Sequence, residues 1–266
     1  MITPPPDSER NEKLKAFDRL LTLMDELRLN CPWDRKQTFE SLRHLTLEEV
    51  YELSDAILNE KKEELKKELG DVLLHLIFYA RIASEQQLFH IGDVINSLCD
   101  KLIFRHPHIY GDVTVHSEEE VKRNWENLKK LEGQKLTLSG VPASLPPVIK
   151  AMRIQEKARG AGFDWEKPEQ VWEKVEEEIA EFKEKTDAEA FNRQEAEKEL
   201  GDVFFSLINY ARFLGINPDE ALERTNRKFI FRFNYLEQQA AADGKTLQDM
   251  KLEEMDRYWE QAKKLE

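Results

Sequence analysis

A six-residue string that occurs twice in this chain constrains its fold more than any other feature. Lys67–Val72 reads Lys-Glu-Leu-Gly-Asp-Val, and Lys198–Val203 repeats it without a change. A second match follows each string, because Lys101–Arg105 and Lys228–Arg232 share the pattern Lys-x-Ile-Phe-Arg. The matched segments keep a nearly constant offset along the chain. This pattern is typical of a tandem duplication, in which each half is one copy of a structural unit.

Each copy is expected to be helical. Of the 266 residues, 40% are hydrophobic and 35% are charged, with only 10 glycines and 10 prolines, which favours an all-α protein. Apolar residues at spacings of three and four predict the first helix, and Thr46 with Glu49 has the form of a capping box that would start the second. One predicted helix begins at residue 46. The others span about residues 8–29, 59–87, 91–105, 117–131, 148–159, 168–185, 188–214, 218–240 and 247–265.

One segment interrupts the helical pattern between the two copies. Residues 132–147 concentrate glycine and proline and lose the helical period, which predicts a linker. The predicted fold is therefore all-α, a tandem duplication of a helical-bundle unit. The N-terminal domain would span residues 8–131 and the C-terminal domain residues 148–266.

Acidic residues recur in the same arrangement in both copies. In each, two pairs of carboxylates stand three residues apart, a spacing that places both members of a pair on one helical face. Like charges that converge cannot all stay ionised unless a cation lies between them. Hard divalent cations prefer such oxygen ligands. The candidate metal ligands are Glu49, Glu52, Glu68 and Asp71 in the first copy and Glu178, Glu181, Glu199 and Asp202 in the second.

Cationic and aromatic residues suggest what a bound metal would act on. Lys228 and Arg232 lie four apart on one helix face and suit a phosphate chain, and Trp259 could stack on a base. Mg²⁺ is commonly held by a few carboxylates together with substrate phosphates. These parts predict metal-assisted hydrolysis of a nucleoside di- or triphosphate. Taken alone, the two cations would more often form a solvated helix face, and the tryptophan would more often be core.

Further motifs complete a resemblance to a known family. Cys-Pro-Trp-Asp at 31–34, Arg-His-Pro-His at 105–108 and Gly-Phe-Asp-Trp at 162–165 accompany the duplicated carboxylate pattern. Over about residues 10–266 the chain resembles the MazG family of the all-α NTP pyrophosphatase superfamily. The resemblance implies hydrolysis of a nucleoside triphosphate to the monophosphate and pyrophosphate, a nucleotide-pool house-cleaning activity. It also implies a helical bundle, dependence on Mg²⁺ (with Mn²⁺ as a possible substitute) and a homodimer. We expect a metal-activated water to attack the α-phosphorus.

The resemblance also assigns roles to individual residues. The catalytic carboxylates would be Glu178, Glu181, Glu199 and Asp202, with the first-copy set in parallel. Lys174 gives the second copy one more cation than the first, which has Leu45 at that position, so the second half is the favoured catalytic half. The implied nucleotide-binding residues are Lys174, Glu178, Glu195, Lys198, Asp202, Lys228, Arg232 and Trp259.

Charge and composition exclude several other classes. With 40 basic and 53 acidic residues the net charge is −13, which argues against direct nucleic-acid binding. No stretch reads as a membrane span or a secretory signal, so we expect a soluble, cytoplasmic protein. Cys31 and Cys99 are expected to be free thiols.

Three alternatives remain open at this point. One is a narrower nucleotide hydrolase of the same superfamily, acting on dUTP or phosphoribosyl-ATP. Another is a di-iron or di-manganese carboxylate bundle, but that design wants Glu-x-x-His pairs, and none of the six histidines has a glutamate three residues before it. The third is a non-enzymatic helical scaffold whose carboxylates form a solvated face.

Overall fold

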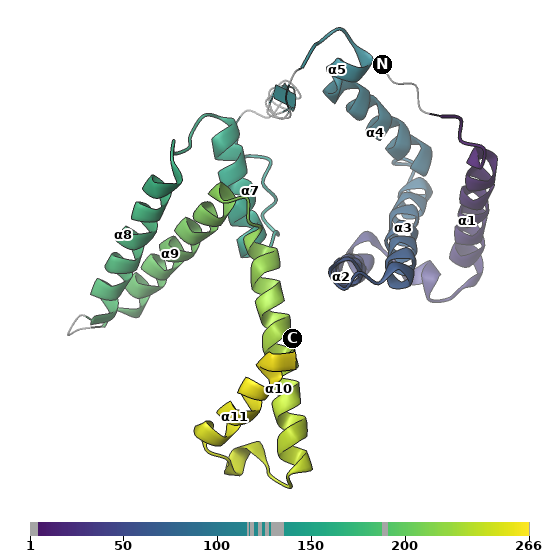
Figure 1. The fold of residues 1–266 in the computed structure, drawn as a ribbon. Helices are drawn as coiled ribbons and strands as arrows, with labels where there is room; N and C mark the ends of the chain where they lie inside the picture. The colour runs from purple at the N-terminus through teal and green to yellow at the C-terminus, as the bar shows by residue number, and fades with distance from the viewer. Residues whose placement is uncertain are drawn as a thin grey trace. The chain divides into compact units, whose positions relative to one another are not determined.

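The computed structural model describes residues 5–115, 117, 120, 121, 124, 125, 128, 136–187 and 191–265. The chain divides into two compact units, Met1–Trp125 and Glu126–Glu266. Within the described residues, helices joined by turns are the only regular structure (Figure 1). The all-α prediction is confirmed.

The first unit is organised around α2 and α3, which are joined by a turn at residues 59–61 and pack as an antiparallel pair. Helix α1 lies beside α3 (Figure 1). The buried core of this unit is made by side chains from these three helices, including Met24, Leu42, Ile77 and Phe78. Burial of such apolar side chains is the main force that holds the pair together. The elements are α1 (Arg10–Asn30), η1 (Asp34–Lys36), α2 (Phe39–Leu58), α3 (Lys62–Glu85), α4 (Ile91–Arg105) and α5 (Pro107–Tyr110).

The second helix begins earlier than the sequence predicts. Thr38 caps it, because its Oγ1 accepts a hydrogen bond from the Ser41 N–H at 3.2 Å, while the Thr38 N–H donates to the Ser41 Oγ at 2.8 Å. Thr46 lies inside α2, where its hydroxyl donates to the Leu42 carbonyl at 2.9 Å. The predicted helix start at Thr46 is therefore wrong. Glu49 consequently has no capping role that competes with metal binding.

The second unit repeats the helix pair as α8 and α9, which also run antiparallel (Figure 1). The repeated Lys-Glu-Leu-Gly-Asp-Val string lies on α3 in one unit and on α9 in the other. The predicted final helix is divided, because a 3-10 turn precedes α11. The elements are α7 (Pro147–Gly160), α8 (Pro168–Asp187), α9 (Arg193–Phe213), α10 (Pro218–Ala242), η2 (Leu247–Asp249), α11 (Leu252–Ala262) and η3 (Lys263–Leu265).

Some predictions fall partly outside the described residues. Most of the helix predicted for 117–131 lies there, although the predicted cap at Ser117 accepts a hydrogen bond from the Glu120 N–H at 3.2 Å. The first part of the predicted linker, 132–135, also lies outside, and residues 136–146 contain no helix. The exact domain boundaries stay a prediction. No helix in the described part of the chain is long and apolar enough to cross a membrane.

Candidate metal and nucleotide site

Three of the four predicted carboxylates of the second unit come together between α8 and α9. Glu178 reaches from α8 toward Glu199 and Asp202 on α9, and one oxygen of each lies within 4.8 Å of the others. Glu178 is only 8% exposed, whereas Asp202 is exposed. The cluster is therefore closed on the α8 side and open to solvent along α9.

Local sequence explains why these side chains meet. Glu199 and Asp202 are three residues apart, so they share one face of α9. Val175 on α8 and Val203 on α9 are buried, which holds the two helices together beside the cluster. Glu178 follows Val175 by three residues and is thereby turned toward the same seam.

Glu181 does not belong to the group that can share an ion. Its side chain is exposed, and its oxygens are not among those within 4.8 Å of one another. Loss of hydration raises the pKa of Glu181, and the negative charges of Glu178 and Glu199 raise this pKa further. Glu181 is thus near enough to feel the cluster electrostatically and lies at its rim.

A lysine compensates part of the negative charge. The ammonium nitrogen of Lys174 lies 2.8 Å from Glu178 and 2.9 Å from Glu177. Hydrogen bonds to Glu177 and Glu178 raise the pKa of Lys174, so the side chain is protonated at neutral pH. The second unit therefore places a fixed positive charge beside its carboxylates.

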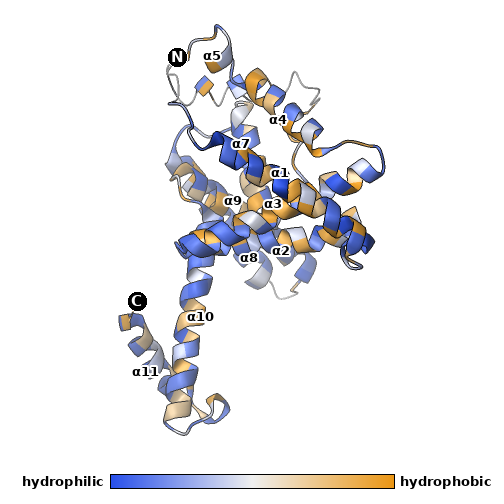
Figure 2. Ribbon diagram, turned by 90° about the vertical axis from the view of Figure 1, so that its right-hand side faces the viewer, coloured by the Kyte–Doolittle hydropathy of each residue, from blue (hydrophilic) through white to orange (hydrophobic). Residues whose placement is uncertain are grey.

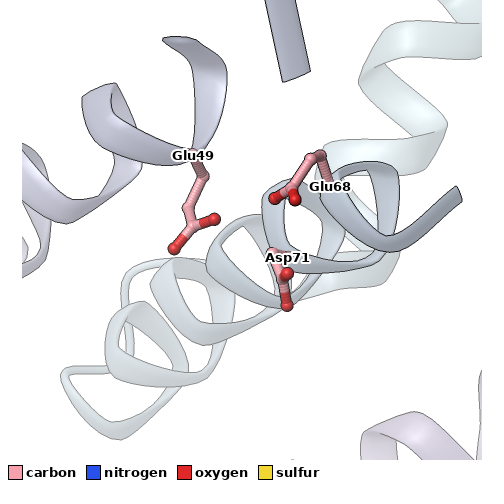
Figure 3. Close-up of side chains that lie close together, drawn as sticks. All are labelled: Glu49, Glu68 and Asp71. Carbon is pink, nitrogen blue, oxygen red and sulfur yellow. The ribbon is translucent and has the colours of Figure 1, made fainter. Parts of the chain in front are cut away.

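The first unit builds the same cluster from α2 and α3. Figure 3 shows Glu49 reaching from α2 toward Glu68 and Asp71 on α3, and one oxygen of each lies within 4.8 Å of the others. Partial burial raises the pKa of Glu49, and the charges of Asp71, Glu52 and Glu68 raise it further. Glu52, like Glu181, is exposed and lies outside the group.

The compensating lysine comes from a different helix in the first unit. Lys67 on α3 places its ammonium nitrogen 3.0 Å from Glu68 and 3.7 Å from Asp71. The hydrogen bond to Glu68 and its negative charge raise the pKa of Lys67. Lys67 and its counterpart on α9, Lys198, are both exposed, and of the two only Lys67 forms an ion pair with a carboxylate among the described residues. The two clusters therefore share their carboxylates but take their positive charge from opposite sides.

One buried carboxylate oxygen indicates whether these residues are suited to bind a metal ion. Glu68 is 5% exposed, and its Oε2 atom has no hydrogen-bond partner among the described residues. An unpartnered buried polar group costs roughly 1–3 kcal/mol, and a charged one costs more, unless a ligand satisfies it. Carboxylate oxygens are the donors that Mg²⁺, Mn²⁺ and Ca²⁺ prefer. The donor set thus fits a hard divalent cation.

A pocket of about 200 Å³ adjoins the carboxylates of the second unit. The first unit also has a cavity, of about 220 Å³, but no member of its carboxylate cluster lines it. Of these two cavities, only the second places a ligand next to a possible metal site. Its lining residues are Trp165, Val171, Lys174, Glu178, Asp202, Phe205, Ser206 and Asn209.

Five of the eight lining residues were not predicted from the sequence, and Trp165 and Asn209 are two of them. Trp165 belongs to the Gly-Phe-Asp-Trp motif that supports the family resemblance, but no role followed from that motif. Asn209 is 4% exposed and gave no signal at all, because a single asparagine in an apolar helix stretch reads as ordinary sequence. Only the packing of α8 against α9 brings it to the pocket.

The remaining predicted nucleotide-binding residues do not line this pocket. Lys228 and Arg232 lie on α10, and the Arg232 guanidinium carbon is 5.6 Å from the ring centroid of Trp259 on α11. Glu195 and Lys198 are exposed near the start of α9. Nucleotide contact by these five residues stays a prediction.

Comparison with known proteins agrees with the duplicated geometry. A family model described as the MazG nucleotide pyrophosphohydrolase domain matches residues 37–110 and again residues 166–236. The first match contains α2 and α3, and the second contains α8 and α9, so each match includes one carboxylate cluster. The predicted tandem duplication is confirmed.

Relatives match over nearly the whole chain. Nucleoside triphosphate pyrophosphohydrolase/pyrophosphatase MazG of Thermotoga maritima is 44% identical over 252 residues, which are 93% of this chain and 95% of that protein. Nucleoside triphosphate pyrophosphohydrolase of Escherichia coli K12 is 38% identical over 260 residues, which are 95% of this chain and 99% of that protein. The uncharacterized protein YabN of Bacillus subtilis is 43% identical over 98% of this chain and 54% of its own length. Two domain matches and this full-length similarity show that the chain belongs to the MazG family.

Proposed function

We propose that this protein hydrolyses nucleoside triphosphates to nucleoside monophosphate and pyrophosphate, with its main site in the second unit. The observation that carries the proposal is the joint presence of the Glu178–Glu199–Asp202 cluster, the Lys174 ammonium group and an adjoining pocket. The names of the Thermotoga and Escherichia relatives support the reaction. House-cleaning of the nucleotide pool would be its cellular purpose.

Mg²⁺, or Mn²⁺ in its place, would be held by Glu178, Glu199 and Asp202. A divalent cation bound there would lower the pKa of a coordinated water and offset charge on the phosphates. Glu181, at the rim, would hold or orient water at the solvent side of the cluster. Attack would occur at the α-phosphorus, with pyrophosphate as the leaving group.

Lys174 is suited to bind the phosphate chain. Its hydrogen bonds to Glu177 and Glu178 fix the ammonium group at the pocket and keep it protonated. A phosphate oxygen that approaches would therefore meet a positive charge already in place, without a large loss of side-chain entropy. Lys228, Arg232 and Trp259, with Lys198 and Glu195, remain proposed contacts to the nucleotide.

The first unit would bind a cation through Glu49, Glu68 and Asp71, with Glu52 at the rim. The unpartnered buried Oε2 of Glu68 supports this assignment. Since the cavity of this unit does not adjoin its carboxylates, we assign it the smaller share of turnover.

A homodimer is proposed from exposed apolar surface in the first unit. Helix α4 carries many hydrophobic residues (Figure 2), and none of its side chains is buried. Val94, Ile95, Leu98 and Leu102 are between 40% and 45% exposed and follow a helical spacing. Soluble monomers seldom leave contiguous apolar surface uncovered. Sedimentation equilibrium should give a dimer mass for the wild type, and a strictly monomeric protein would contradict the proposal.

The decisive experiment is product analysis by phosphorus NMR. The protein is incubated with each of the four NTPs and Mg²⁺, and the products are identified by their chemical shifts. Pyrophosphate with nucleoside monophosphate supports the proposed reaction, whereas orthophosphate with nucleoside diphosphate contradicts it.

Matched variants in the two units then test the assignment to the second half. Glu178→Gln removes one candidate ligand there, and Glu49→Gln removes its counterpart in the first unit. We expect Glu178→Gln to reduce turnover at least tenfold more than Glu49→Gln does. The opposite order would move the main site to the first unit.

A further inference from the structure

We propose that Asn209 and Trp165 form a base-binding subsite that selects nucleobases presenting a carbonyl oxygen over those presenting an amino group. The subsite would lie in the pocket beside Glu178 and Asp202. The inference deepens the proposed function and rests on it in one respect, which is that the ligand of the pocket is a nucleotide.

The orientation of the Asn209 amide is fixed by its neighbour. The Nε of Arg212 donates a hydrogen bond to Asn209 Oδ1 at 2.9 Å. A guanidinium group has only donors, so the amide oxygen must face Arg212 and the amide nitrogen must face away. That Nδ2 donates no hydrogen bond to any residue that the structure describes, although Asn209 is only 4% exposed. A nearly buried side chain at the pocket wall is thus left with an unused donor.

Arg212 is itself held in place by Asp164, which lies in the segment between α7 and α8. Its Nη1 donates to Asp164 Oδ2 at 3.0 Å, and its Nη2 donates to Asp164 Oδ1. The guanidinium carbon also lies 4.7 Å from the ring centroid of Phe213. Because Trp165 directly follows Asp164, the same ion pair fixes the backbone next to Trp165 and the amide of Asn209. One interaction therefore positions both proposed base contacts.

The character of the pocket favours a base over a phosphate chain. Away from Lys174 and the carboxylates, its wall is mainly apolar and includes Trp165, Val171 and Phe205. A flat base buries well on such a surface and can stack on an aromatic ring, whereas a triphosphate would lose its hydration there. The volume of about 200 Å³ is below the roughly 300–1,000 Å³ typical of pockets for whole drug-sized ligands. It suits one part of a nucleotide.

The position of Asn209 along α9 indicates how a nucleotide would lie in the pocket. Asn209 follows Asp202 by seven residues, which is about 10 Å along a helix axis. The acidic end of the pocket would hold the phosphates, and Asn209 would meet the edge of the base that is farthest from them. At that edge uracil, hypoxanthine and guanine present a carbonyl oxygen, whereas cytosine and adenine present an amino group. The Asn209 Nδ2 donor matches the first set.

The first unit lacks these features. The position equivalent to Asn209 in the repeat is Phe78, and the position equivalent to Val171 is Leu42. Phe78 and Leu42 are 2% and 0% exposed and belong to the core of that unit. The donor and the space for a base are therefore features of the second unit, as expected if they serve its ligand and not the shared fold.

Equilibrium binding tests the subsite without depending on turnover. The full chain with Mg²⁺ is titrated calorimetrically with α,β-imido analogues of UTP and CTP, and of ITP and ATP. We expect the wild type to bind the carbonyl member of each pair about tenfold more tightly, the effect of one hydrogen bond. Asn209→Asp keeps the shape and the contact to Arg212 but replaces the donor with an acceptor. It should reduce that ratio to one or below.

Trp165→Ala provides an independent test at an exposed position. Loss of stacking should weaken both members of each pair about tenfold and leave their ratio unchanged. The matched control is Trp33→Ala, because Trp33 lies in the Cys-Pro-Trp-Asp motif of the first unit and is similarly exposed, at 54% against 41% for Trp165. This control should bind all analogues as the wild type does.

Several results would overturn the subsite. Equal affinity of the wild type for the two members of each pair would do so, as would no binding of any analogue or a wild-type ratio in Asn209→Asp. Hydrolysis of the natural triphosphates is measured separately. Base selectivity in binding without pyrophosphate release would support the subsite and contradict the proposed reaction. Pyrophosphate release without base selectivity would support the reaction and contradict the subsite.

Discussion

The ammonium nitrogen of Lys174 lies 2.8 Å from a carboxylate oxygen of Glu178, one turn further along α8. In the first unit the corresponding charge is supplied by Lys67, which contacts Glu68 from α3. The same set of carboxylates is therefore neutralised from different helices. This difference allows the contribution of each unit to be measured separately.

Lys174→Met should lower kcat/KM for NTP hydrolysis by about 10- to 100-fold, the effect of losing a hydrogen bond to a charged phosphate. The matched control is Lys67→Met in the first unit, which should change kcat/KM less than about threefold. Both are measured by steady-state pyrophosphate release. An equal loss in the two variants would show that both units contribute to turnover.

Mg²⁺ should stabilise the folded protein, because the carboxylates within each cluster repel one another when no cation lies between them. A ligand at 100 times its dissociation constant adds about 2.7 kcal/mol to the free energy of unfolding. Thermal unfolding followed with and without Mg²⁺ should show a higher Tm in its presence, reversed by EDTA. The double variant Glu68→Gln, Glu199→Gln should lose most of this shift. Tm values indifferent to Mg²⁺ in the wild type would contradict metal binding at both clusters.

Glu85→Gln should destabilise the first unit at neutral pH by about 1–3 kcal/mol. The reason is that Glu85 accepts two hydrogen bonds at 2.9 Å from Arg28, and the Arg28 side chain is only 10% exposed. These hydrogen bonds lower the pKa of Glu85 below its ordinary value of 4.5. The stabilisation is therefore complete above about pH 4.5 and is lost as the pH falls through the lowered pKa.

Urea unfolding across a pH series checks this prediction. The difference in unfolding free energy between wild type and Glu85→Gln should shrink as the solution becomes more acidic than pH 4.5. Glu26→Gln, at an exposed position on α1, is the control and should be nearly neutral throughout. A difference that stays constant down to pH 3 would show that the charge of Glu85 is not its source.

Gly201→Ala should stabilise the protein by about 0.5–1 kcal/mol, since Gly201 lies inside α9 and a Cβ atom there would meet nothing within 4 Å. Gly215→Ala is a sharp control. Its Cβ would also meet nothing, but its φ of +69° disfavours a side chain, so this variant should be destabilised. Chemical denaturation measures both. Loss of activity in a stabilised Gly201→Ala protein would indicate that a ligand or a second copy approaches that face.

Much of the candidate site could be predicted from sequence because it depends on helical spacing. Glu199 and Asp202 share a face of α9 through a three-residue interval, and the repeat made the first-unit equivalents recognisable. The bounds of α4 were also predicted correctly, from the histidine–proline sequence that follows it. Periodicity within one helix is local information, which a single sequence carries.

What could not be predicted depends on contacts between distant segments. The start of α2 is a local exception, because Thr46 and Glu49 have the form of a capping box, whereas Thr38 caps the helix through Ser41, three residues away. Asn209 was missed because its orientation comes from Arg212, which is in turn held by Asp164 from a separate loop. The repeat pairs Lys174 with Leu45 and Lys67 with Lys198, but it did not indicate that Lys67 forms an ion pair with its cluster while Lys198 forms none with a residue that the structure describes.

Phe78 and Leu42 close in one copy the space that Asn209 and Val171 border in the other. The residues at these positions therefore contribute to core packing in one copy and to a pocket wall in the other. In the first copy these two positions belong to the packed core, so substitutions there do not alter the pocket that adjoins the carboxylates of the second copy. Engineering for heat resistance should accordingly begin in the first copy, and attempts to change the preferred nucleotide should begin in the second.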